Sequence, residues 1–269
     1  MLTSINKREL PEVIGLCEVE NELVLKDLIS AGKLKRGDYG IIHNDSPDLR
    51  GIDVALLYRK GAFTPLDIRN LPIHFPRDTT RVRDILLVKG KTDHAEILYL
   101  FVNHWKSRSG GQKQTEQMRM YSAVVLRKAI DSIINLEPNA KIISLGDYND
   151  EPTNASIYSI LRAGNKRKNA SSRDLYNLMY DPHNLGDVGT YHYKGSWNML
   201  DQVIISQALL QDQKGYHTSF GGGKIFKEEW MLYDNPKANA KVPNKTYGGD
   251  IYFGGISDHL PVYVVLWRK

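Results

Sequence analysis

The chain has 269 residues, of which 41% are hydrophobic and 25% charged, so it is long enough to fold as one globular domain around a large core. We expect no membrane span, because no run of about 18 apolar residues occurs, and no basic-then-apolar leader marks the N-terminus for export. The lone Cys17 excludes an internal disulfide. The 36 Lys and Arg exceed the 31 Asp and Glu, which gives a net charge of +5 and mildly favours an anionic partner.

The N-terminal part of the chain predicts a strand, a helix and a second strand. Residues 13–20 form a near-continuous apolar run, which is typical of a buried strand. Asn21 is suited to cap a helix over residues 22–31, and Gly32 is suited to end it. Residues 51–60 mix an apolar run with partial alternation and predict another strand.

The rest of the chain predicts one long helix between strands. Apolar residues recur at helical spacing over residues 115–136, which predicts the most regular helix. The flanking apolar and β-branched segments predict strands over residues 95–105, 140–145, 201–206 and 259–267.

Two segments are expected to be exposed loops. Residues 163–174 are polar and basic, and residues 221–255 are rich in Gly. Many strands with few helices favour a sandwich of mixed β-sheets.

Acids, amides and histidines gather where the predicted strands end. These residues are Glu18, Glu20, Asn103, His104, Asp147, Asn149, Asp201, Asp258 and His259. Oxygen and imidazole ligands suit a hard cation such as Mg²⁺. Such a cation next to a His–Asp couple is suited to the hydrolysis of phosphoesters.

Six motifs in order resemble the endonuclease/exonuclease/phosphatase superfamily, which has the deoxyribonuclease I-like fold. They are "GLCEVEN", "RGIDVALLY", "FVNHWKS", "SLGDYND", "LDQVIIS" and "SDHLPV". A bacterial branch of that superfamily also resembles "GTYHYKGSWNMLDQ" and "TYGGDIYFGGISDHLPVY" here. The resemblance implies an α/β fold in which two packed mixed β-sheets are flanked by helices, as a single domain over residues 1–269.

The resemblance implies a cofactor and the residues that hold it. Glu18 matches the metal-binding glutamate of the family and is expected to hold Mg²⁺ or Mn²⁺. A carboxylate at the end of a buried strand is costly unless a cation or donor neutralises it, which favours the same role. Asp258 matches a residue near the metal.

The resemblance also implies catalytic roles. Asp147 matches an aspartate that positions or deprotonates the attacking water, and Asn149 an amide that donates to the phosphate. His259 matches the catalytic histidine, oriented by Asp201, and it acts either as a base or as a charged phosphate clamp. His104 matches a second histidine that donates to the scissile phosphate.

The role of three further residues depends on their surroundings. Free cysteine is usually a small buried hydrophobe, so we interpret Cys17 as part of the core. Arg50 and Asp53 lie near the substrate-facing strand of the family, where a salt bridge at the strand edge is as plausible as a role in the site.

The sequence leaves several substrates open. A phosphodiesterase or nuclease is the leading hypothesis, because basic loops and the aromatic residues Trp105, Trp197, Tyr191 and Tyr193 are suited to backbone phosphates and stacked bases. Trp197 is the expected substrate-binding aromatic. DNA or RNA is as plausible as other phosphoesters, and a phosphomonoesterase of sugar, lipid or inositol phosphates is an alternative.

The N-terminus departs from the pattern of the family. Members begin with a central strand that ends in an Asn near the metal, whereas residues 1–10 resemble the end of the helix that follows it. We therefore expect a truncated domain that lacks the first strand, and an export signal could be lost with it, so that either a cytoplasmic or a secreted location remains open. A catalytically impaired phosphate- or nucleic-acid-binding module is the alternative function. The chain is expected to be a monomer.

Overall fold

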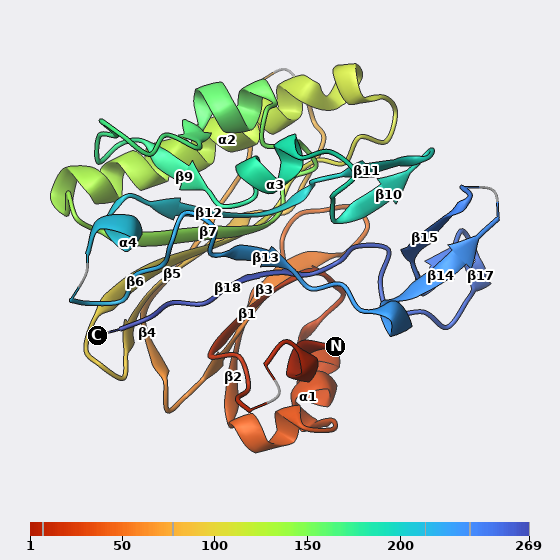
Figure 1. Ribbon diagram of the computed structural model, residues 1–269, viewed down its shortest axis with the longest axis horizontal. Coiled ribbons are helices and arrows are strands. Elements are labelled where there is room, and N and C mark those ends of the chain that lie inside the picture. Colours follow the sequence, from red (N-terminus) through yellow and green to blue (C-terminus); the bar gives the residue numbers. More distant parts are fainter. Residues whose placement is uncertain (7, 77, 213, 237, 269) are drawn as a thin grey trace.

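The computed structural model describes residues 1–6, 8–76, 78–212, 214–236 and 238–268, and they form stacked layers. A large sheet lies in the middle, the helix α2 (Gln112–Leu136) covers one face, and smaller sheets cover the other (Figure 1). The helix α1 (Glu22–Ser30) lies outside the smaller sheets. This arrangement confirms the predicted α/β sandwich.

The large sheet has seven strands and is mixed. Its parallel pairs are β6–β7 and β8–β9, and its other neighbours are antiparallel. The connection from β6 to β7 contains α2, as a parallel crossover requires. The strand order is β4 (Phe63–Leu71), β5 (Ile85–Thr92), β6 (Ile97–His104), β7 (Lys141–Asp147), β12 (Asp201–Ser206), β9 (Leu175–Asn177) and β8 (Ala163–Gly164).

The second layer consists of two antiparallel sheets rather than the one mixed sheet that the resemblance implied. One contains β1 (Val13–Val19), β3 (Asp53–Arg59) and β2 (Tyr39–His43), and the other pairs β13 (Gly223–Ile225) with β18 (Val262–Val264). Both pack on the same face of the large sheet, because side chains of β1 and β18 join one apolar cluster there.

Short elements complete the fold. The hairpins are β10 (Tyr191–Tyr193) with β11 (Ser196–Asn198), β14 (Leu232–Asn235) with β15 (Ala240–Pro243), and β16 (Tyr247–Gly248) with β17 (Ile251–Tyr252). The short helices are α3 (Tyr180–Asn184) and α4 (Ala208–Gln211), with single turns at Leu2–Ser4, Leu34–Gly37, Ser156–Ile160 and Glu229–Met231.

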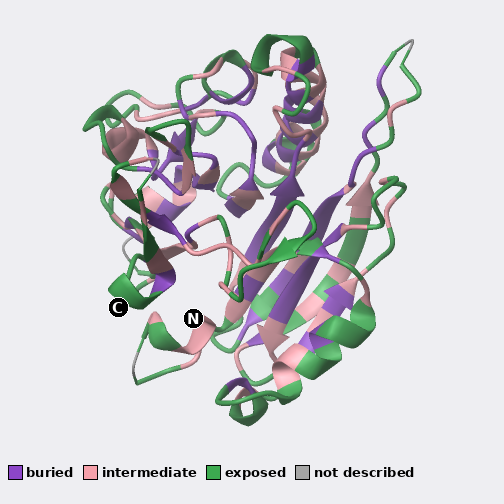
Figure 2. Ribbon diagram, turned by 90° about the vertical axis from the view of Figure 1, so that its right-hand side faces the viewer, coloured by how far each residue is buried: buried purple, intermediate pink, exposed green. Residues whose placement is uncertain are grey.

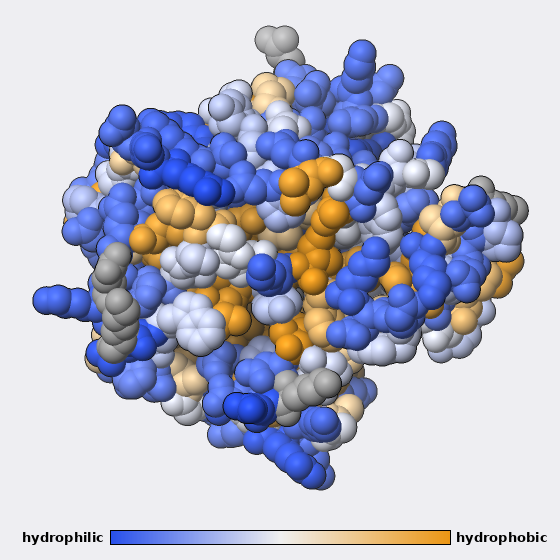
Figure 3. Space-filling view, in the orientation of Figure 1, coloured by the Kyte–Doolittle hydropathy of each residue, from blue (hydrophilic) through white to orange (hydrophobic). Residues whose placement is uncertain are grey.

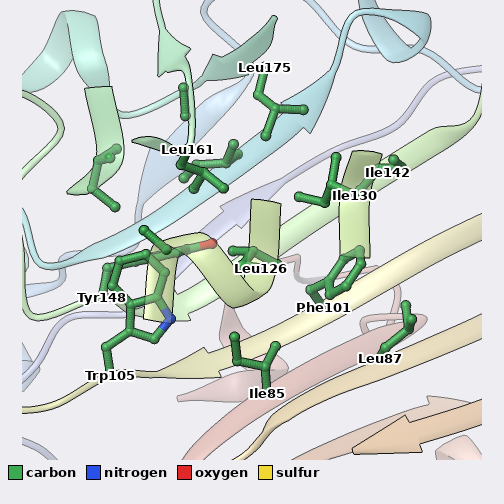
Figure 4. Packing of buried hydrophobic residues seen from close by; sticks show 14 of the residues in the cluster. Ile85, Leu87, Phe101, Trp105, Leu126, Ile130, Ile142, Tyr148, Leu161 and Leu175 are labelled. Carbon is green, nitrogen blue, oxygen red and sulfur yellow. The ribbon is translucent and has the colours of Figure 1, made fainter. Parts of the chain in front are cut away.

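The core between α2 and the large sheet fixes the ends of the central strands. Trp105 follows β6 and Tyr148 follows β7. Their fully buried rings pack edge to face, with the ring centroids 4.8 Å apart (Figure 4). Leu126 and Ile130 of α2 pack in the same cluster. Figure 2 shows that buried residues run along the middle strands, whereas exposed residues gather in the outer loops. The segments that follow β6 and β7 are therefore held in place by packing on the side of the sheet that α2 covers.

Several elements differ from the sequence prediction. The patterns did not indicate β4 and β5, and the expected loop over residues 221–255 contains the short strands β13 to β17. β4 carries polar and partly exposed residues at the edge of the sheet, so its apolar signal is weak. Among the described residues, no helix is long and apolar enough to cross a membrane.

Candidate active site

Three neighbouring strands bring three polar side chains into one row. His104 at the end of β6 is paired in register with Asp147 at the end of β7, and Asp147 is paired with Asp201 at the start of β12. Residues opposite each other on adjacent strands are neighbours in space. The row therefore follows from the register of the sheet.

Gly146 allows β7 to turn at this point. Its φ is +128°, a conformation that residues with side chains rarely adopt, and an added Cβ would lie 2.0 Å from the carbonyl oxygen of Asn103. The glycine thus lets the strands β6 and β7 approach closely while Asp147 points into the site.

His259 reaches the row from the segment that precedes β18. Its Nδ1 lies 2.6 Å from Oδ2 of Asp201. Thr190 holds both partners, because its carbonyl oxygen accepts from the backbone N–H of Leu260 at 2.8 Å and its hydroxyl accepts from the backbone N–H of Asp201 at 3.0 Å. The structure thus brings together His104, Asp147, Asp201 and His259.

The His259 imidazole is held in its charged form. Burial alone would lower its pKa, but the carboxylates of Asp201, Asp147 and Asp258 outweigh that effect and raise the pKa to about 10. At neutral pH this residue is an imidazolium with one ring nitrogen bonded to Asp201.

Asp147, in contrast, is held partly in its uncharged form. Burial raises the pKa of this carboxyl to about 6, and the charge of Asp201 adds to the rise, while His259 and the backbone N–H of Asn149 oppose it. Asp147 is therefore ionised only above about pH 6, close to the range in which a general base is most effective.

His104 is buried and uncharged. Burial, and then the charges of Arg83, Arg50 and His259, lower its pKa well below 6.5. Its Nε2 lies 3.6 Å from Oδ2 of Asp147, and its Nδ1 has no hydrogen-bond partner among the described residues. His104 can therefore donate one neutral N–H without carrying a charge.

Asn149 holds Asp147 rather than extending toward a substrate. Its backbone N–H donates to Oδ1 of Asp147 at 2.8 Å, and its side-chain Nδ2 donates to Oδ2 at 2.9 Å and to the Trp105 carbonyl at 3.2 Å. The backbone of Asn149 is left-handed, with a φ of +50°. Tyr148, between Asp147 and Asn149, is fully buried.

Two arginines that sequence reasoning did not assign support these side chains. Arg108 donates from Nε to the Asn149 carbonyl at 2.8 Å and from a terminal nitrogen to Oδ1 of Asn198 at 3.0 Å. Arg83 donates to the carbonyls of His104 and Trp105. The sequence shows only that each belongs to a basic segment, and no local signal marks its partners.

Glu18 is exposed, which corrects the expectation of a buried carboxylate. Its side chain is 60% accessible, and the nearest ion-pair partner is Arg50 at 3.9 Å. Glu18 has a φ of +59° where the pairing of β1 with β3 shifts register after Cys17. Bulges with strained residues often lie beside active sites, so the conformation rather than burial supports a role for Glu18.

Asp258 and Trp197, which the sequence also assigned to the site, lie outside the row of His104, Asp147 and Asp201. Asp258 is exposed, and its charge still raises the pKa of His259 and of Tyr191. Trp197 pairs with His192 across the hairpin β10–β11 and packs against the cluster around Phe226, away from the face that carries Tyr191. Trp197 is therefore not part of the site described here, although the sequence predicted that it binds substrate.

Ligand atoms of Asp147, Asp201 and His259 lie within 4.8 Å of one another, a spacing that suits a metal ion, but His259 can bind a metal only in its uncharged form. Within the described residues, neither Glu18 nor Asp258 belongs to such a group of three. The carboxylate-rich donor set fits a hard divalent cation.

A second acidic group lies elsewhere and is structural. It contains His43, Asp45 and Asp53. The Asp53 carboxylate is occupied by His43 Nε2 at 3.1 Å and by the backbone N–H of Ser46 at 2.8 Å. Asp53 thus serves the local structure, whereas the charge of Arg50 acts on His104.

Cys17 packs against the core, as predicted. Its thiol donates to the Asn103 carbonyl at 3.4 Å, and burial raises its pKa. A thiol that stays protonated is a poor nucleophile.

The layered sheets, the polar row and the His–Asp pair define a phosphoester hydrolase with the deoxyribonuclease I-like fold. The chain belongs to the Endonuclease/Exonuclease/phosphatase family, whose sequence profile matches residues 1–268. The family is generally dependent on divalent metals. No curated protein matches the chain.

Solved structures agree with this fold. An endonuclease/exonuclease/phosphatase from Bacteroides vulgatus is 17% identical with a TM-score of 0.60, and the alignment covers 100% of this chain and 88% of that one. A functionally unknown conserved protein from Enterococcus faecalis is 13% identical with a TM-score of 0.61, covering 100% and 89%. A mannosyl-6-phosphatase from Bacteroides thetaiotaomicron is 18% identical with a TM-score of 0.57, covering 95% and 85%.

Proposed function

We propose that this protein is a divalent-metal-dependent phosphodiesterase that hydrolyses a P–O bond by attack of a water molecule. The observation that carries the proposal is the in-register row of His104, Asp147 and Asp201, completed by His259 at 2.6 Å from Asp201. The row joins a carboxylate of raised pKa to an imidazolium, which is the pairing of a base and an acid that such a reaction needs.

Asp147 is the proposed general base. Above about pH 6 its carboxylate is ionised and can accept a proton from the attacking water. The three hydrogen bonds made by Asn149 fix the orientation of that carboxylate and of the strand end. Asn149 is therefore a positioning residue in this account.

His259 is the proposed cationic partner of the phosphate. Its imidazolium can stabilise the negative charge that develops on the phosphoryl oxygens, or donate a proton to the leaving oxygen. Asp201 orients the ring through Nδ1 and favours the charged form. His104, which is neutral, can donate a hydrogen bond to the phosphate without adding charge.

Mg²⁺ or Mn²⁺ is the proposed cofactor. The resemblance supports Glu18 and Asp258 at the rim as the residues that hold it, which leaves the Asp147 carboxylate free to act as the base. When bound, the cation neutralises charge on the phosphate.

The choice of a diester rests on the exposed ring of Tyr193 beside the row, because the second ester group of a diester can contact it. The mannosyl-6-phosphatase among the structural neighbours keeps a phosphomonoesterase of sugar phosphates as the competing hypothesis.

A substrate panel tests the proposal. The protein is assayed with bis(p-nitrophenyl) phosphate, p-nitrophenyl phosphate, DNA and RNA, each with Mg²⁺, Mn²⁺ or a chelator. We expect hydrolysis of diesters that the chelator abolishes. Preference for the monoester would favour the competing hypothesis, and no hydrolysis with either metal would indicate a phosphate- or nucleic-acid-binding module.

A further inference from the structure

One face of the hairpin β10–β11 continues the active site as a column of rings. Tyr191 stacks on His259 with ring centroids 4.7 Å apart and planes inclined by 29°. Tyr193 lies next to Tyr191 at 6.2 Å, with planes inclined by only 15°, and it is 54% exposed. The column therefore begins at the proposed cationic group and ends in solvent.

The hydrogen bonds of the hairpin show that this face is turned toward the reacting centre. Tyr191 is opposite Asn198 in the ladder, so both side chains lie on the same face. Asn198 accepts a hydrogen bond from Arg108, which also donates to the carbonyl of Asn149. The face that carries Tyr191 and Tyr193 thus borders the loop that holds the proposed base.

A positive charge lies over the exposed ring of Tyr193. Nζ of Lys194, at the tip of the hairpin, is 5.4 Å from the centroid of Tyr193. An exposed aromatic ring next to a cation suits a ligand that combines a planar group with negative charge.

We propose that Tyr193, supported by Tyr191, is a stacking subsite for the base of a nucleoside phosphoester whose phosphate reacts beside His259. A nucleoside holds its planar base one sugar away from the phosphate, which places the base at the level of the tyrosine column. Every base has a flat face, so this subsite discriminates the presence of a base rather than its identity. The inference rests on the proposed function and specifies its substrate class.

Matched dinucleotides test the subsite. The enzyme is given thymidylyl-thymidine and two analogues that each lack one base, and kcat/KM is measured with Mn²⁺ by separating the products. Stacking on an aromatic side chain contributes about 5- to 100-fold. We expect the wild-type protein to prefer the full dinucleotide over one of the analogues by about 10-fold or more, and Tyr193→Ala to reduce that ratio toward one.

Two variants distinguish the loss of stacking from a general loss of activity or folding. Tyr193→Phe keeps the ring and should keep most of the preference. Tyr233→Ala removes a tyrosine of the strand β14, 37% exposed, on the neighbouring hairpin and outside the column, and should leave the ratio at its wild-type value. An equal preference in wild-type and Tyr193→Ala proteins, or no preference in the wild type, would overturn the inference.

A binding measurement keeps the inference testable without turnover. Calorimetry with a chelator compares thymidine 5′-monophosphate with deoxyribose 5-phosphate, and the nucleotide should bind about 10-fold more tightly to the wild type but not to Tyr193→Ala. Equal affinities would reject the subsite, whereas absent hydrolysis together with this binding preference would reject only the proposed function.

A higher kcat/KM for oligothymidylate than for the dinucleotide would identify the source of the base as a nucleic acid strand, and similar values would identify free nucleotides.

Discussion

At the scale of single residues, the surroundings of Asp147 and His259 set their pKa values far apart, so that one can act as the proposed base while the other stays charged. Asp147 is buried and adjoins another carboxylate, which raises its pKa to about 6, while three carboxylates raise the pKa of His259 to about 10. Above about pH 6 the base is ionised, and below about pH 10 the imidazole is charged. The window between the two values is the range in which both have the form that the proposed reaction needs.

This separation predicts a bell-shaped pH dependence. We expect kcat/KM for a phosphodiester to rise through about pH 6 and to fall through about pH 10. In Asp201→Asn the neighbouring charge is lost, so the pKa of His259 falls and the alkaline limb moves to lower pH, with turnover reduced by roughly 10²-fold or more. An alkaline limb that stays in place in the variant would reject the pairing.

Glu18 provides a second prediction at this scale. Glu18→Gln should abolish binding of Mg²⁺ in a calorimetric titration while the free energy of unfolding changes by no more than about 0.5 kcal/mol, because the side chain is exposed. Glu12→Gln, at another exposed carboxylate, is the matched control and should bind Mg²⁺ as the wild type does. Unchanged affinity in Glu18→Gln would place the metal elsewhere.

At the scale of elements, the close approach of β6 and β7 depends on one glycine. Gly146→Ala should lower the free energy of unfolding by more than about 1 kcal/mol, because its φ is +128° and its new Cβ would meet the Asn103 carbonyl at 2.0 Å. The activity should fall as well, since Asp147 is the next residue. Gly61→Ala, where an added Cβ meets nothing within 4 Å, should be nearly neutral. Equal melting temperatures for the two variants would contradict this account of the strand end.

The second layer has two strand edges that face the same strip of the large sheet. Within the described residues, β1 pairs only with β3 and β18 only with β13, while β1 lies over β6 and β7 and β18 lies over β12. In the view of Figure 3, apolar residues gather across the middle of the molecule, where the layers meet. Unpaired edges next to apolar surface favour the addition of another strand.

We therefore expect an apolar strand placed between β1 and β18 to stabilise the fold. A chain extended upstream by such a strand, ending in Asn, should melt at a higher temperature, since each buried apolar side chain contributes about 1.5 to 3 kcal/mol. Its metal-dependent activity should also rise, because partners of metal ligands typically contribute about 10- to 100-fold. Equal stability and equal activity of the two chains would show that the second layer needs no further strand.

Sequence patterns predicted several elements with strong local signals, although they missed β5, which begins with four buried apolar residues. The periodicity of residues 115–136 predicted α2 because its apolar side has helical spacing, and the apolar run at 140–145 predicted β7. β4 was missed because an edge strand needs few apolar residues. The split of the second layer depends on strand pairing, which no local pattern specifies.

The candidate site could be predicted only where acids, amides and histidines stand at the ends of predicted strands. The motifs singled out Asp147, Asp201 and His259, which the structure brings together, but the positions of the Asn149 and Trp197 side chains depend on a left-handed backbone and on which face of a hairpin a residue occupies. Arg108 was missed because its partners are distant in sequence.

At the scale of the whole molecule, the layers place the proposed chemistry at one end of the central strands of the large sheet. α2 and the buried rings of Trp105 and Tyr148 hold the ends of β6 and β7 from one side. The segment before β18 brings His259 from the other side, tied by Thr190. The site is thus assembled from segments far apart in the chain, and its geometry requires the complete packing of the layers.

The most direct test of the central claim is the rate of metal-dependent phosphodiester hydrolysis by Asp147→Asn. Asparagine has the same shape and keeps an oxygen to accept from the Asn149 backbone, but it cannot accept a proton, so kcat should fall by about 10²- to 10⁴-fold. Its amide nitrogen replaces the oxygen that accepts from Asn149 Nδ2, so the free energy of unfolding should fall by about 1 to 3 kcal/mol while the protein stays folded. Asp187→Asn, at an exposed turn, is the control and should retain wild-type activity. Wild-type turnover in Asp147→Asn would contradict the account, because the row of His104, Asp147 and Asp201 would then not be the reacting centre.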